Sequence, residues 1–419
     1  MKFNVFAKNI LVTILLFINV IIFFKIITYY TTPEVISEYF AIKALASIFF
    51  FGLSLRLPEV LYILRGEKGL SLYDLTGVHY FFIVTVVGLI LILLLISYIF
   101  YDPISIYIGA FFIFISNEIV ESYMSLHRLF NRYGKMILMR IILLIKSILL
   151  LILLNLELIV LDSSRTIIAF ETILLMSLFI IYILINYKHF YNFFERKRLL
   201  ISNLDILRNT WLTSFSKISF DALPNYLLSF FASDLIYAQY NIARKLYGLI
   251  HSAQLSFIQV FNTISVELKD RFLEYLKRYY FIMIILNMFS FLGLFIIGKF
   301  MISLLTKEIY ANDITIYIIF ISLSVIFLYI LLYPVRQWFI LNKMIKVNNQ
   351  GLKISMVFVF FISLITVPIF GVYAAAIIHP LGLLLPIVIT LIVLPTSSIK
   401  IIKEYYYNLY KLAFKKTLN

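Results

Sequence analysis

One predicted helix carries a row of polar side chains that could bind an anion. Asn241, Arg244 and His251 follow one another at spacings of three and seven residues, so they share one helical face, and Lys245 adjoins Arg244. The two cations lie about nine residues inside an apolar stretch, at a depth of about 14 Å. Two neighbouring cations suit a multiply charged anion such as a phosphate or diphosphate, because both can donate hydrogen bonds to its oxygens. On this row, His251 is a candidate proton-responsive group.

Asp221 is the first of three carboxylates within apolar stretches that could couple to an ion. It lies four residues after Lys217, one above the other on a helix face, and Pro224 follows within a turn and predicts a kink. One interpretation is an internal pair, with Lys217 or with Arg244 across the bundle. The other is that Asp221 takes up and releases a proton as its partner moves.

Glu118 and Glu121 are the other two carboxylates, in the inner part of one apolar stretch. A short hairpin to the next stretch places Glu121 near Arg140, which predicts a structural ion pair. The alternative for both residues is that they lie on an ion path. A third reading pairs Glu118 with the cations of the Arg244 row.

Lys43 and Lys146 are two further cations at depth. A charge at the centre of the bilayer costs about 2.5–3.5 kcal/mol, so each needs a reason. Lys43 could snorkel to the outer surface or line a cavity. Lys146 has no acid near it in the sequence, which favours a cavity-facing side chain. Both are candidates for binding the same anion.

Membrane-spanning helices must position these side chains. Apolar residues make up 63% of the chain and charged residues 14%, against about 45–50% and about 25% in soluble domains. The hydropathy pattern predicts an all-α polytopic membrane protein with about twelve spans, each able to cross a core of about 30 Å. We place the spans at residues 9–28, 38–61, 78–101, 104–124, 136–156, 166–187, 210–232, 236–262, 279–305, 312–334, 351–370 and 372–399.

Lysine and arginine fall almost entirely on one side of this pattern. Of the 36 in the chain, 24 lie in the loops and tails of one side, and the other side has only Arg165 and Lys307. Short loops rich in Lys and Arg stay in the cytoplasm. We therefore expect both termini to be cytoplasmic and the protein to lie in the bacterial inner (cytoplasmic) membrane.

The chain divides into two halves of six spans. Residues 38–43 read EYFAIK and residues 239–244 read QYNIAR, an offset of 201 residues that aligns Tyr39 with Tyr240 and Lys43 with Arg244. We predict an N-terminal half at residues 1–195 and a C-terminal half with a basic tail at 196–419, with a central cavity between them. The charged segment 264–278 is expected to be a short amphipathic helix at the membrane surface.

Several function classes are excluded by what the sequence lacks. There is no cysteine, so no thiolate nucleophile or cysteine metal site, and we expect no metal. A phosphate-cradling GxxxxGK[ST] motif is also missing, so energy must come from a proton or sodium gradient or from the cargo itself, without a cofactor. No loop is long enough for a catalytic domain, which argues against an enzyme. The net charge of +15 fits an anionic membrane surface rather than nucleic acid.

Two neighbouring stretches resemble the seventh and eighth helices of a transporter family. The first reads SKISFD at 216–221, with two leucines at 227–228, and the second reads YNIARKL at 240–246. They are similar to those of bacterial polysaccharide flippases, the O-antigen or capsule repeat-unit exporters of the superfamily that includes multidrug exporters. Ala222 and the Ala238-Gln239 pair depart from the family, which often has Arg and Gly there.

The resemblance implies a flippase without enzymatic activity. Its cargo would be an undecaprenyl-diphosphate-linked oligosaccharide of lipopolysaccharide or capsule, moved from the cytoplasmic to the periplasmic leaflet by alternating access. Its partners would be this lipid-linked oligosaccharide, the bilayer and other polysaccharide-assembly membrane proteins.

Two other functions compete with the flippase. The closer is a cation- or proton-coupled multidrug exporter of the same fold, which would be expected to have an acidic cavity, whereas cations outnumber acids in these spans. The more distant is a polysaccharide polymerase or ligase, which would be expected to have a larger outside loop.

Overall fold

The computed structural model describes residues 3–49, 69–100, 103–157, 159–192, 218–267, 272–341 and 345–393, with a few single positions between 57 and 65. Within these ranges the chain forms helices and turns and no strand, so the predicted all-α class is confirmed. Apolar side chains cover the helices, and each helix satisfies its own backbone polar groups, as a bilayer requires.

The described residues of the first half form six long helices. They are α1 (Phe3–Tyr30), α2 (Pro33–Phe49), α4 (Leu72–Phe100), α5 (Pro103–Leu129), α6 (Tyr133–Asn155) and α7 (Ser164–Ile185). A short 3-10 turn, η2 (Tyr187–Asn192), follows α7.

The described part of the second half begins with a π-helical turn, η3 (Ile218–Ala222), and a short helix, α10 (Leu223–Phe231). The long helices α11 (Asp234–Glu267), α12 (Phe272–Leu305), α13 (Asp313–Leu341) and α14 (Ile345–Val393) complete it, with a 3-10 turn, η5 (Glu308–Tyr310), before α13.

Eight helices in the described part are long and apolar enough to cross a membrane. Seven of them lie on single predicted spans, and the eighth, within α14, covers the predicted span 351–370 and the described part of the span 372–399. The predicted eighth span corresponds to α11, which carries the polar row and is not one of the eight. Part of the predicted seventh span lies outside the described residues.

The chain separates into two compact units. The first unit contains residues 1–218, 225–238 and 305–307, and the second contains 219–224, 239–304 and 308–419. The predicted boundary at 195/196 lies outside the described residues.

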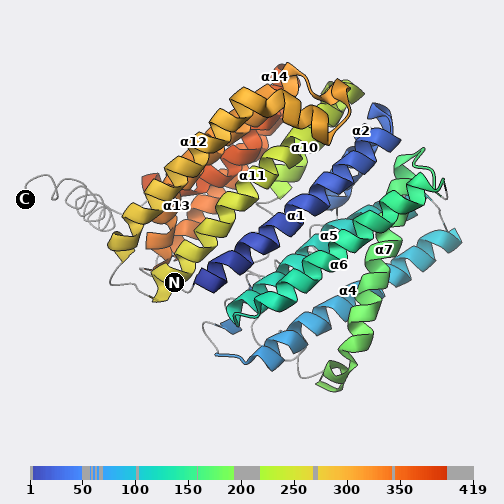
Figure 1. The fold of residues 1–419 in the computed structure, drawn as a ribbon, viewed down its shortest axis with the longest axis horizontal. Helices are drawn as coiled ribbons and strands as arrows, with labels where there is room; N and C mark the ends of the chain where they lie inside the picture. The colour runs from blue at the N-terminus through green and yellow to red at the C-terminus, as the bar shows by residue number, and fades with distance from the viewer. Residues whose placement is uncertain are drawn as a thin grey trace, which may run out of the picture. The chain divides into compact units, whose positions relative to one another are not determined.

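In the first unit, α5 lies at the centre of the packing. It contacts α2, α4, α6 and α7, while α1 runs along α6 (Figure 1). Buried His79 of α4 ties three helices together, because its ring nitrogens lie 3.1 Å from the Tyr182 hydroxyl of α7 and 3.2 Å from the Ile119 carbonyl of α5. Between α1 and α6, the Ser147 hydroxyl donates to Asn19 at 2.7 Å.

In the second unit, α14 folds back on itself at Gly371. This glycine has φ 56° and ψ −130°, a backbone conformation that side-chain-bearing residues avoid. Gly351 then meets the far end of the same helix, since a Cβ on it would lie 2.8 Å from the Pro386 carbonyl. The turn predicted at Gly371 is therefore present, and the two predicted spans form an antiparallel hairpin.

The expectation of a separate amphipathic helix at 264–278 is wrong. Helix α11 continues to Glu267 and α12 begins at Phe272, so both described parts of this segment extend long helices. The apolar residues at helical spacing belong to the ends of these helices, where charged residues lie beyond the apolar core.

Candidate anion-binding clusters

In the first unit, one carboxylate brings together two of the predicted anion-binding cations. Glu171 of α7 lies 3.8 Å from the Lys43 ammonium of α2 through one oxygen and 3.8 Å from the Lys146 ammonium of α6 through the other. Tyr39, one turn before Lys43, donates a 2.6 Å hydrogen bond to Glu171 and accepts one of 2.8 Å from Lys43. We call these four residues the Glu171 cluster.

The Glu171 cluster lies at one depth along its three helices. Lys43 is ten residues from the start of α2, Lys146 nine from the end of α6, and Glu171 seven from the start of α7. These ends lie on the predicted outer side, so the charges lie about 10–15 Å below it by helix rise. The Glu171 side chain is 9% exposed and those of Lys43 and Lys146 are 20% and 15% exposed. The cluster carries one more positive charge than negative.

The second unit contains an ion pair between Asp221 of η3 and Arg244 of α11. The His379 ring of α14 approaches the same carboxylate oxygen, with Nδ1 2.9 Å from it. The Tyr247 hydroxyl, one turn after Arg244, hydrogen-bonds to the guanidinium. We call these four residues the Asp221 cluster. Of the alternatives for Asp221, the pair with Arg244 is present, and Lys217 lies outside the described residues.

The local backbone explains how Asp221 reaches this position. A π-helical turn, a feature that often marks functional sites, spans residues 218–222 and ends two residues before Pro224. The preceding side chain, Phe220, lies against α14, where a Cβ on Gly382 would fall 2.3 Å from its ring. Gly382 is one helical turn after His379, so the contact that seats Phe220 also brings Asp221 beside His379.

The polar row predicted on α11 divides into two faces. Asn241 is buried at 2% exposure one turn before Arg244, and the His251 ring packs edge-on against Tyr329 of α13 at 6.1 Å. Lys245 is exposed. Adjacent residues on a helix point about 100° apart, so the two cations do not share the direction that the sequence suggested.

The remaining two carboxylates have structural partners in the first unit. Glu118 accepts a 3.0 Å hydrogen bond from the Leu57 backbone N–H. Glu121 pairs with Arg140 at 3.1 Å, so the predicted hairpin pair is present. The Arg140 side chain is 10% exposed and that of Glu121 is 56% exposed.

Glu121→Gln is expected to leave export close to the wild-type rate. The amide oxygen can still accept from Arg140, and a pair with one exposed partner contributes about 1 kcal/mol or less. Arg140→Ala is the contrasting variant, with lower thermal stability expected because it empties a buried position. If the Glu121→Gln protein is present in normal amounts but does not export, Glu121 lies on an ion path and is not only a structural partner of Arg140.

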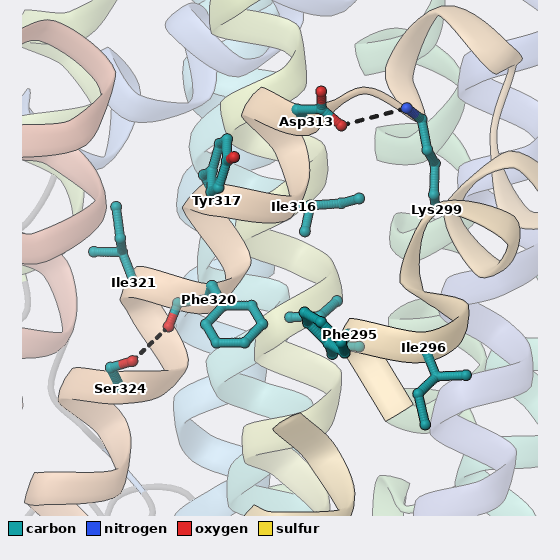
Figure 2. Close-up of a pocket in the computed structure, with 10 residues that line it drawn as sticks. Phe295, Ile296, Lys299, Asp313, Ile316, Tyr317, Phe320, Ile321 and Ser324 are labelled. Carbon is teal, nitrogen blue, oxygen red and sulfur yellow. Dashed lines mark hydrogen bonds and ion pairs between the residues drawn. The ribbon is translucent and has the colours of Figure 1, made fainter. Parts of the chain in front are cut away.

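A groove on the second unit lies between α12 and α13 (Figure 2). It has a volume of about 560 Å³, with a Lys299–Asp313 pair of 3.3 Å toward one end and Ser324 toward the other. Its walls are mainly apolar, including Phe295 and Phe320. None of the site residues predicted from the sequence lines it.

Four members of the clusters were not predicted as site residues: Tyr39, Glu171, Tyr247 and His379. Glu171 is an acid within an apolar stretch, and His379 lies directly before Pro380 in another. The signal for Glu171 was indirect: two lysines within apolar stretches need a compensating charge, and Lys146 has no acid near it in the sequence.

The fold is shared with a solved membrane flippase. The structure of lipid II flippase MurJ in an inward closed conformation aligns with 92% of this chain and 85% of that chain, at a TM-score of 0.60 and 16% identity. An inward-facing multidrug resistance MATE family transporter of the MOP superfamily aligns with 91% of this chain and 93% of that chain, at a TM-score of 0.45 and 14% identity. No protein-family profile and no curated sequence matches the chain. The chain is therefore an all-α, multi-pass membrane protein with the fold seen in the MurJ structure.

Proposed function

We propose that this protein is a flippase for an undecaprenyl-diphosphate-linked oligosaccharide, an O-antigen or capsule repeat unit. It moves the cargo from the cytoplasmic to the periplasmic leaflet of the bacterial inner membrane by alternating access. The polar sugar and diphosphate need a protein path, while the prenyl chain can stay in the lipid.

The Glu171 cluster is the observation that carries this proposal. Two lysines converge on a single carboxylate within the span region, which leaves an excess of positive charge where the bilayer offers no solvation. A multiply charged anion compensates such a site, whereas a cationic drug would be repelled. This charge balance favours the flippase over the multidrug exporter.

We assign to each unit its own cations for a diphosphate. These are Lys43 and Lys146 of the Glu171 cluster in the first unit, and Arg244 with its neighbour Lys245 in the second. Arginine suits this role, since its planar fork matches phosphate oxygens. The buried amide of Asn241 and the ring of His251 contribute polar contacts to the cargo's head group.

Asp221 is our candidate for coupling transport to a proton or sodium ion. It lies between a guanidinium and an imidazole, so a change in its charge would alter both contacts. The likeness in fold to a flippase of lipid II supports a lipid cargo. We expect no cofactor, and other polysaccharide-assembly proteins of the membrane are the expected protein partners.

The first test is a deletion strain, in which lipid-linked oligosaccharide and surface polysaccharide are both quantified. We expect full-length repeat units to accumulate on undecaprenyl diphosphate while surface polymer is lost, with both restored by the wild-type gene. Normal surface polymer together with sensitivity to cationic drugs would contradict the proposal and favour a multidrug exporter. Short lipid-linked chains on the periplasmic side would instead indicate a polymerase.

A further inference from the structure

We propose that Glu171 is a built-in substitute for the cargo's anion: it holds Lys43 and Lys146 together before the cargo arrives and gives up Lys146 when the diphosphate binds. This inference rests on the proposed function and adds a positioning and specificity-determining residue to the first unit. It makes binding a replacement of one internal carboxylate by a more highly charged anion.

Glu171 solves a problem of charge repulsion. Two ammonium groups in a poorly solvated site repel each other, and their flexible stems would carry them apart. One carboxylate with an ammonium 3.8 Å from each of its oxygens keeps both cations pointing at one place. The lysines therefore stay converged in the absence of cargo.

The distances indicate which of the two lysines leaves Glu171 more easily when an anion binds. The Tyr39 hydroxyl holds Glu171 at 2.6 Å, and Lys43 is held by Tyr39 at 2.8 Å. Both of these are ordinary hydrogen-bond lengths, whereas 3.8 Å between an ammonium and a carboxylate is not. Among the residues that the structure describes, Glu171 is the one partner found for Lys146. Lys146 is thus held by charge alone and is the cation free to move to a diphosphate oxygen.

The other half of the chain repeats part of this arrangement. The sequence repeat aligns Lys43 with Arg244, and Arg244 also meets an internal carboxylate, Asp221. In each half, the cation that the repeat aligns therefore lies beside an internal carboxylate. In the first half, a second lysine lies beside the same carboxylate.

Inorganic pyrophosphate is the probe for this inference, titrated calorimetrically into the purified full-length protein in nanodiscs. Glu171→Gln keeps an acceptor for Tyr39 but removes the competing charge, so we expect pyrophosphate to bind about tenfold or more tightly. Adding Lys146→Met to this variant should cancel the gain. Asp162→Asn, an equal charge change at an exposed site before α7, should bind like the wild type.

Export provides the second readout. Since Glu171→Gln offers Lys146 no partner to return to, cargo release should slow and lipid-linked units should accumulate, although binding is tighter. A residue that only stabilised the fold would lower the melting temperature without tightening binding. Glu171→Asp keeps the charge at a shorter reach and should give a smaller gain, which provides a test if Glu171→Gln does not fold.

Three outcomes would overturn the inference. They are unchanged or weaker pyrophosphate binding by a folded Glu171→Gln protein, a gain that persists without Lys146, and no binding by the wild type. Pyrophosphate binding could follow the expected pattern while the deletion strain shows no trapped lipid-linked oligosaccharide. In that case the anion site is supported and the proposed cargo is wrong. If the cargo is trapped but Glu171→Gln gives no gain, only the role of Glu171 fails.

Discussion

Arg244→Ala should reduce export by about 100-fold or more. Truncating one partner of a buried, hydrogen-bonded charge pair costs about 2–5 kcal/mol in binding, and each 1.4 kcal/mol is tenfold. The guanidinium is both our candidate for the cargo's diphosphate and the partner of Asp221, with the Tyr247 hydroxyl beside it. Surface polysaccharide in the complemented deletion strain measures the loss.

This variant should also lower the stability of the second unit, so fold and function must be separated. Breaking a buried pair costs about 3–5 kcal/mol; we expect the lower end, because the side chains of Arg244 and Asp221 are 18% and 26% exposed. The double variant Asp221→Ala with Arg244→Ala removes both charges, so it should recover most of the stability but none of the export. Lys353→Ala, an exposed cation of α14, is the control and should behave like the wild type.

An Arg244→Ala protein that exports normally would contradict the assignment of this residue to the cargo. Recovery of export in the double variant would do the same, because it would show that Arg244 serves only to neutralise Asp221. Recovery of stability without export would show that the loss of export is not a folding defect, and it is expected if Arg244 binds cargo or if Asp221 couples transport to an ion.

The helices could be predicted from the sequence because their signal is local. Apolar runs such as those of α1, α6 and α7 are long enough to span a bilayer, and lipid allows few alternatives to a helix there. The turn at Gly371 was visible for the same reason, since it interrupts one continuous apolar run. The segment 264–278 was misjudged because charges mark the end of the apolar core and not the end of a helix.

The charge pairs could be predicted only where the two partners are close in the sequence. Glu121 and Arg140 face each other across a short hairpin, and their pair was expected. The Glu171 cluster joins α2, α6 and α7, whose lateral arrangement no sequence spacing specifies. For Asp221, the sequence offered Lys217 and Arg244 as partners, and the packing of η3 against α14 places Asp221 beside Arg244 and His379.

The direction of Lys245 could have been anticipated. Two adjacent residues on a helix cannot point the same way, so treating Arg244 and Lys245 as one pair of cations conflicted with helix geometry. The structure leaves Lys245 exposed while Arg244 is partly buried. If both bind the same diphosphate, the anion must reach α11 along the boundary between these two faces.

Gly382→Ala should be among the most damaging single-methyl changes in the second unit. The added Cβ would lie 2.3 Å from the Phe220 ring, a distance that requires the ring or the backbone to shift. Overpacking of this kind costs about 1–3 kcal/mol. Thermal unfolding of the purified protein measures the loss, and Gly88→Ala is the control, because a Cβ there meets nothing within 4 Å.

A smaller side chain at position 220 should relieve the clash with the methyl group of Gly382→Ala. The double variant therefore tests how Asp221 is positioned. Phe220→Leu in the Gly382→Ala background should recover part of the stability, since the shorter side chain leaves room for the methyl group. Export should recover in parallel, because Phe220 is adjacent to Asp221 and a displaced ring would pull the carboxylate away from Arg244 and His379. Recovery of stability without export would mean that the Phe220 ring itself, and not the space it fills, sets the position of Asp221. An unchanged melting temperature in Gly382→Ala would show that the ring yields freely and that this contact does not fix the Asp221 cluster.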